Sequence, residues 1–458
     1  MGAQRLKSPA TLLPAVALAL GWLLAVNAKG AVAVVGLGAG CVAVWWASEI
    51  TGKRGATILL GVLLTGAIAV GKLFTTIPFG PLYITDAVLA LLAAWLLTLM
   101  LLGRLHDELR LPRGAWPCLI GYVGWGVFAA AYGHAHGGDL YFTARDAVVV
   151  AYAPVALFVA ILFPTREDVK ALLRVLYWAA VGVTFLYLTA RFTGWYGPNH
   201  ALGLQMAFFF IPVLATYTAG GRVRWWEWLL LELQVAIPIT LGTRTAWTAL
   251  AVALVFLMVT AKRRFGVWMT LGFATATFVA VAILAPVKTQ PIEQEAASFA
   301  ARGAPTSDSN AAANASWRTE FWRHDLRAVA HHPVTGVGFG PPADFCFKQN
   351  GECWDTRESH DPTQISGPHN GYIDVFYRMG LPGLLLLLGL IWSALRAGRS
   401  ALPDETARIG IALLLFAAVT AFFSVALEGP YMGVPFWALI GMLWVIGREP
   451  PVRSASAG

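Results

Sequence analysis

The chain has few charged residues, and this scarcity excludes a soluble globular fold. Only 13% of its 458 residues are Asp, Glu, Lys or Arg, whereas 57% are hydrophobic. Soluble domains carry about a quarter charged residues. Apolar runs of about 20 residues recur from end to end, which is the length a helix needs to cross a bilayer. Helices satisfy their own backbone hydrogen bonds in lipid, so the composition predicts an all-α polytopic membrane protein.

Cysteine is also scarce, and four cysteines are too few for a disulfide scaffold. Cys41 and Cys118 fall in apolar runs and are expected to be small packing residues. Cys346 and Cys353 lie in a polar stretch, where an oxidising compartment would allow them to form a disulfide. The pairing of these last two cysteines is therefore a prediction that depends on which side of the membrane the stretch faces.

The apolar runs between charged residues, Pro and Gly predict about 12–14 membrane spans. The first 28 residues also resemble a signal peptide, but the next apolar run follows at once, so we favour a retained first helix. Cleavage would not change the topology beyond it. The predicted spans are 12–28, 31–50, 56–71, 83–103, 115–132, 147–163, 171–190, 201–218, 226–241, 245–261, 265–286, 372–395, 407–427 and 431–447.

Basic residues orient these spans. With the N-terminus inside, most of the 33 Lys and Arg residues fall in cytoplasmic connections, as in inner-membrane proteins. Both termini are then cytoplasmic. The net charge of +8 follows from this bias, so we expect no nucleic-acid partner. Few basic residues remain in the short outer connections, and among them are Arg145, Arg191 and Arg244.

One long polar loop, 287–371, falls outside and divides the chain into three parts. A bundle of spans, 1–286, precedes it, and the last spans, 372–458, follow it. Within the loop, residues 316–332 have apolar residues near helical spacing and end before Pro333, which predicts an amphipathic helix. We favour a structural role for this helix, on the membrane surface or over a cavity. Its interleaved arginines, Arg318, Arg323 and Arg327, are candidates for the acceptor side.

Three outer residues are the strongest candidates for chemistry. His369 lies in the sequence Gly-Pro-His-Asn-Gly-Tyr, where the loop returns to the membrane, and a histidine there is placed to act as a base near neutral pH. Arg191 and Arg244 stand alone at helix ends, against the charge bias. Snorkelling to headgroups would explain either one. Together, two guanidinium groups could bind a phosphate or diphosphate.

Other motifs give weaker evidence of a functional site. The sequence Gly-Val-Gly-Phe-Gly at 336–340 is similar to a nucleotide-binding loop, but Pro341 replaces the third glycine of that motif and no strand–helix–strand unit surrounds it. We therefore reject nucleotide binding. No outer loop has the spacing of a metal site, and His331 and His332 are adjacent, so they do not share a helix face. No metal and no other cofactor is predicted.

The stretch RTEFWRHDLRAVAHHPVTGVGFG at 318–340, followed by GPHNGYIDVFYRMGLPG at 367–383, resembles the O-antigen ligase and polymerase superfamily. The segments RFTGWYGPN and GTRTA add to this resemblance, which covers roughly residues 185–395. It implies a GT-C-type membrane glycosyltransferase that takes glycan from undecaprenyl diphosphate at the periplasmic face without metal. His369 matches the family's loop histidine, and Arg191 and Arg244 match its donor arginines. The chain departs from the family in Thr243, often serine there, and in having more spans than the usual twelve.

The resemblance leaves two related functions open. A ligase would pass the glycan to lipid A–core, with Asn370 and the three arginines of the amphipathic helix on the acceptor side. A polymerase would join lipid-linked repeat units and would need a second cationic site. Only Arg145 and Arg378 are spare for such a site, so we favour the ligase. A membrane transporter is less favoured, because the outer spans lack buried acidic residues and paired broken helices.

Overall fold

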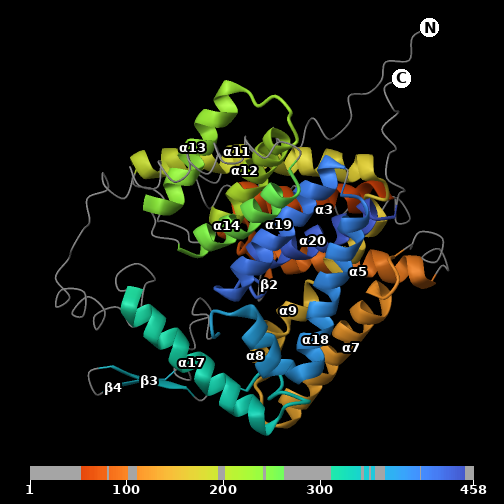
Figure 1. Cartoon of the computed structure of the whole chain (residues 1–458). Helices are drawn as coiled ribbons and strands as arrows, with labels where there is room; N and C mark the ends of the chain where they lie inside the picture. The colour runs from red at the N-terminus through yellow and green to blue at the C-terminus, as the bar shows by residue number, and fades with distance from the viewer. Residues whose placement is uncertain are drawn as a thin grey trace.

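In the computed structural model, residues 53–79, 82–101, 111–193, 202–240, 244–261, 311–341, 345–349, 352–355, 367–402 and 404–448 are described. Over these ranges the chain is mainly helical (Figure 1). Four helices in them are long and apolar enough to cross a membrane, and a bent helix pair would be a fifth span. Four shorter apolar helices accompany them. The predicted all-α polytopic fold is confirmed.

The helices coincide with the predicted spans from 56 to 261 and from 372 to 447, while the spans predicted at 12–28, 31–50 and 265–286 lie outside the described residues. Two short antiparallel hairpins, which no apolar pattern indicated, lie in connections. The elements are α3 (Lys53–Ala69), α4 (Lys72–Thr75), β1 (Pro78–Phe79), β2 (Leu82–Tyr83), α5 (Ile84–Leu101), α7 (Ala115–Ala135), α8 (Leu140–Asp146), α9 (Val148–Ala151), α10 (Pro154–Leu162), α11 (Arg166–Thr193), α12 (Leu202–Thr218), α13 (Trp225–Thr240), α14 (Arg244–Val259), α17 (Ala311–His331), β3 (Cys346–Gln349), β4 (Glu352–Asp355), α18 (Gly371–Ser400), α19 (Glu405–Phe422) and α20 (Pro430–Ile446).

The span predicted at 147–163 is the one that differs most. It is divided between α9 and α10, with α8 directly before it, and the pair 140–146 and 148–162 is bent by 40°. Asp139 begins α8, since its carboxylate accepts hydrogen bonds from the N–H groups of Tyr141 and Phe142. Pro154 separates α9 from α10 because it cannot donate a backbone hydrogen bond, and it stands in the first turn of α10.

Helix α20 is the centre of the bundle. Every one of its residues is buried, including Trp437 and Trp444. It packs against α10, α18 and α19. By contrast, α18 exposes the large apolar side chains Leu385, Leu388 and Trp392. In a chain that crosses a membrane, such exposed apolar residues face lipid.

The bundle has two distinct ends. At one, which we call the Arg166 end, Arg166 contacts Asp404 at 2.9 Å and donates to the carbonyl of Ile446 at 3.1 Å. These residues begin α11, precede α19 and end α20. The opposite end, which we call the His369 end, contains the end of α7, all of α8 and the start of α18.

Helix α18 is broken near its beginning, at the His369 end. Gly380 has φ 64° and ψ −169°, a conformation that side chains with a Cβ rarely adopt. Pro382 follows and has no N–H to donate to the carbonyl of Arg378, four residues earlier. The break therefore frees backbone groups in the interior of the protein, where each must find another partner.

The polar groups freed at the break are taken up by other parts of the chain. The segment 333–341, which leads out of α17, supplies most of the partners, and a tryptophan of α7 supplies another. The bonds are Val337 N to Tyr377 O at 2.9 Å, Gly338 N to Arg378 O at 3.1 Å, Leu381 N to Pro333 O at 2.8 Å, and Trp125 Nε1 to Met379 O at 2.7 Å.

Candidate active site

The turn that contains His369 has unusual backbone geometry. His369 has φ 51°, and among the described residues it is the only non-glycine with a positive φ. This conformation is uncommon for a residue with a side chain and is retained only when the surroundings hold it in place. Such strained positions cluster at functional sites, so the geometry supports the choice of His369 made from the sequence.

Helix α17 holds this turn from one side. The ring of Trp317 meets the His369 ring edge to face, with centroids 5.3 Å apart. One turn further along, Trp322 Nε1 donates to the carbonyl of Pro368 at 2.6 Å. The amphipathic helix predicted at 316–332 is thus confirmed, with Phe321 and Val329 buried on its inner face. In Figure 1 it runs along the edge of the bundle, beside β3 and β4, and it packs against α18.

Asn370 holds the turn from the other side. Its side-chain oxygen accepts from the N–H groups of Tyr372 and Ile373, both at 3.1 Å, and so caps the N-terminus of α18. These bonds fix the orientation of the amide and direct Nδ2 away from the cap. Asn370 is fully buried, and Nδ2 has no hydrogen-bond partner among the described residues. A buried donor of this kind is available to another polar group.

A carboxylate that the sequence did not single out lies next to the turn. Glu428 belongs to the connection between α19 and α20, and a Cβ atom placed on Gly367 would lie 2.9 Å from its Oε2. Burial raises the pKa of Glu428 well above its usual value, and Asp374 and Asp146 raise it further. Only its position in the fold reveals it, because nothing in the local sequence distinguishes this glutamate.

The two arginines predicted to bind the donor each lie at the end of a helix whose other end is at the Arg166 end. Arg191 is in the last turn of α11, and α11 begins at the Arg166 end. Arg244 is the first residue of α14, whose other end meets Arg408 of the Arg166 end through Thr260. Their side chains are outside the described parts of the chain, so their convergence on one ligand remains a prediction.

The three arginines of α17 do not act as one group. Arg318 is partly buried and donates to the carbonyl of Phe423 at 3.2 Å, and burial lowers its pKa. Arg323 and Arg327 are exposed. Arg318 therefore ties α17 to the end of α19, while the other two point to the surroundings. An acceptor role for any of the three remains a prediction.

The two loop cysteines lie on the paired strands β3 and β4. The register aligns Cys346 with Asp355 and Cys353 with Lys348. In this register the two cysteines stand two positions out of direct opposition. The disulfide predicted between them is untested by this arrangement of the backbone.

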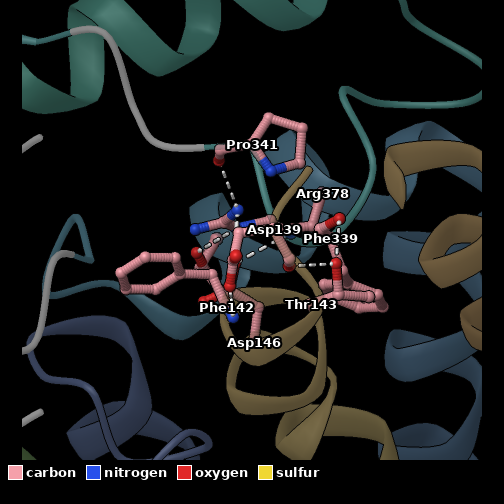
Figure 2. A network of polar contacts seen from close by, with 9 residues as sticks. Asp139, Phe142, Thr143, Asp146, Phe339, Pro341 and Arg378 are labelled. Carbon is pink, nitrogen blue, oxygen red and sulfur yellow. Dashed lines mark hydrogen bonds and ion pairs between the residues drawn. The ribbon is translucent and has the colours of Figure 1, made fainter. Parts of the chain in front are cut away.

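Arg378 is deeply buried in a network of charges rather than spare for a ligand. Its guanidinium contacts the carboxylate of Asp146 at 2.6 Å and that of Asp374 at 3.6 Å. It also donates to the carbonyl of Pro341 at 3.1 Å (Figure 2). Among the described residues, no three His, Cys, Asp or Glu side chains are arranged to hold a metal ion.

The part of the chain that contains this site is similar to a known protein family. Residues 229–388 match the family model described as O-antigen ligase, a stretch that contains Arg244, α17, segment 333–341 and His369. The resemblance to the O-antigen ligase superfamily is confirmed. The match supports a function of O-antigen ligase or polymerase type in a multi-pass membrane protein, with lipid-linked glycan and lipid A–core as the general kinds of partner. No curated protein matches the chain.

Proposed function

We propose that the protein is an O-antigen ligase of a bacterial inner membrane. It transfers glycan from undecaprenyl diphosphate to lipid A–core at the periplasmic face, and both termini are cytoplasmic. The observation that carries the proposal is the strained turn at His369, held between α17 and the cap of α18 within the region matched by the family model. The ring of His369 is then the base that the transfer needs.

The chemistry requires a base and a site for the leaving group. His369 takes the proton of the acceptor hydroxyl as its oxygen forms a bond to the anomeric carbon, and the bond from that carbon to the diphosphate breaks. Arg191 and Arg244 bind the diphosphate, whose negative charge grows as it leaves. A diphosphate is already a good leaving group, so two guanidinium groups can replace the metal ion that other enzymes use.

Purified protein, lipid-linked donor and lipid A–core test the donor site. Arg191→Lys and Arg244→Lys should each cause a severe loss of transfer, because a lysine cannot reproduce the planar fork of an arginine. Transfer should continue in EDTA. A strict requirement for added Mg²⁺ or Mn²⁺ would contradict the arginine model. Vectorial movement of lipid-linked glycan without glycosidic bond formation would instead indicate a transporter.

The contacts of Arg378 favour a ligase over a polymerase. A polymerase must bind a second lipid diphosphate, and Arg378 was one of two arginines spare for that purpose. In the structure it is occupied by Asp146, Asp374 and a backbone carbonyl. Deletion of the gene should leave long glycans on undecaprenyl diphosphate and lipid A–core undecorated. Lipid A–core carrying single repeat units after deletion would identify a polymerase.

A further inference from the structure

The contacts around His369 form a closed ring of structural elements. Helix α17 contacts the turn through Trp317 and Trp322. The turn continues directly into the first part of α18, residues 371–379, through the cap made by Asn370. That part of α18 bonds segment 333–341, and the segment leads back into α17. The position of the His369 imidazole therefore depends on each of these contacts between elements.

Segment 333–341 is the link made of irregular backbone. Gly336, Gly338 and Gly340 all have positive φ. A Cβ on Gly338 would overlap the backbone of Gly133 in α7, so the alternating glycines let the segment lie directly against neighbouring helices. Phe339 N donates to the carbonyl of Ala129 at 3.1 Å. The motif that is similar to a nucleotide loop instead packs between helices and bonds to them. We call segment 333–341 the splint.

One arginine fastens this splint to α18. The guanidinium of Arg378 donates to the carbonyl of Pro341, at the end of the segment, and binds Asp146 of α8. The same Asp146 carboxylate, which Figure 2 shows beside Arg378, accepts from Gly340 N at 3.1 Å. Arg378 and Asp146 thus hold the last residues of the segment between them. The guanidinium group of Arg378 can bond to the Pro341 carbonyl and the Asp146 carboxylate together because it is planar and carries several N–H donors.

We propose that Arg378 is a positioning residue for His369, acting through segment 333–341 and α17. The proposal rests on the function proposed above, because it assigns His369 the role of base. Arg378 itself touches no substrate. It fixes the splint, the splint fixes α17 against the outer part of α18, and α17 fixes the ring of His369 through Trp317. Displacement of a catalytic group by about 1 Å can cost on the order of a hundredfold in rate.

The test uses full-length protein reconstituted in liposomes, with lipid-linked donor and lipid A–core. Arg378→Lys keeps the charge but not the fork, and it should lower kcat on the order of tenfold to a hundredfold with little change in KM. The double variant Arg378→Gln with Asp146→Asn removes a charge from each partner. It should recover thermal stability relative to Arg378→Gln alone without recovering kcat. Arg166→Gln is the matched control, because it removes an equally buried arginine at the other end of the bundle.

Two kinetic outcomes would overturn the proposal. One is wild-type kcat in Arg378→Lys, and the other is kcat that returns together with stability in the double variant, which would make Arg378 a purely structural residue. Hydrogen–deuterium exchange gives a readout independent of activity. Arg378→Lys should raise exchange at 336–340 and at 367–373, and Arg166→Gln should not. Unchanged exchange at 367–373 would refute the positioning role even if the proposed transfer reaction itself were not observed.

Discussion

Arg166 and Arg378 lie at opposite ends of the bundle and make nearly the same contacts. Each is 4% exposed. Each binds an aspartate, Asp404 or Asp146, and donates to a backbone carbonyl. Both arginines are costly to bury, and an aspartate and a carbonyl compensate each of them.

The difference lies in the backbone that each arginine holds. Arg166, the first residue of α11, joins Asp404 before α19 to the end of α20. Arg378 holds a broken helix against a glycine-rich segment that leads to α17. Irregular backbone is tolerated inside a membrane protein only where other groups satisfy it, and it is found there chiefly at functional sites. In the role proposed for Arg378, the same side-chain chemistry that stabilises the fold at one end positions His369 at the other.

The largest contrast between the ends is expected from glycine substitutions. Gly338→Ala would force a Cβ into the backbone of Gly133 at a positive φ, and transfer should fall on the order of a hundredfold as the splint is displaced. Gly447→Ala is the control at the Arg166 end, where a Cβ would lie 2.5 Å from the carbonyl of Ala397. It should lower the melting temperature without a selective loss of transfer. If Gly338→Ala and Gly447→Ala lost transfer activity equally at equal destabilisation, the two ends of the bundle would not differ in function.

The aspartate partners give a smaller, closely matched comparison. The side chains of Asp146 and Asp404 are 17% and 20% exposed. Asp146→Asn and Asp404→Asn each leave an arginine with a weakened partner, and breaking a buried pair costs about 3–5 kcal/mol. Thermal stability should fall similarly in both. Only Asp146→Asn should lower kcat beyond what the loss of folded protein explains, as measured by initial rates at a temperature well below both melting points.

Two tryptophan hydrogen bonds sharpen the comparison further. Trp322→Phe keeps the ring but loses the 2.6 Å bond to Pro368, a change of about 1 kcal/mol. Trp444→Phe loses the 2.9 Å bond to Ser393 in the body of the bundle. We expect a severalfold fall in kcat from the first substitution and none from the second. Identical kinetics in both variants would show that α17 does not restrain the His369 turn.

The smallest effect expected is on pH-dependent stability. Asp325 of α17 is buried, and burial raises its pKa, an effect that His324 and Arg378 reduce only in part. A carboxyl whose pKa is raised by folding stabilises the protein most below its unfolded pKa and loses that contribution as pH rises through the folded value. Asp325→Asn should therefore match wild type near pH 4 and melt at a higher temperature near pH 8. A gap in melting temperature that narrows as pH rises would contradict this assignment.

Much of the fold was predictable because its signals are local. Apolar runs mark helices wherever lipid or a packed core requires them, and α17 followed from helical spacing ended by Pro333. The turn at His369 was also predictable, because Gly, Pro and Asn surround it, while the role of His369 as a base stays a prediction. The division of 147–163 into α9 and α10 was missed, since a single proline in an apolar run does not reveal where backbone bonds are broken.

The network around Arg378 was not predictable from the sequence. Asp146 and Arg378 are more than 200 residues apart, and each has a nearer partner of opposite charge that a local interpretation favours. Glu428 is similar, because its relation to Gly367 arises only when the connection between α19 and α20 packs under the turn. The glycines of 336–340 gave a signal of special backbone geometry, but only the fold shows which helices that backbone contacts.

The role of His369 is tested most directly by transfer of lipid-linked glycan to lipid A–core with purified, reconstituted His369→Ala. Loss of a general base should reduce the rate on the order of a hundredfold to ten-thousandfold, with the melting temperature nearly unchanged. His136→Ala is the matched control, because His136 is an exposed histidine at the same end of the bundle, and that variant should transfer glycan at the wild-type rate. Near-normal transfer by His369→Ala would show that the strained turn is not the reacting centre.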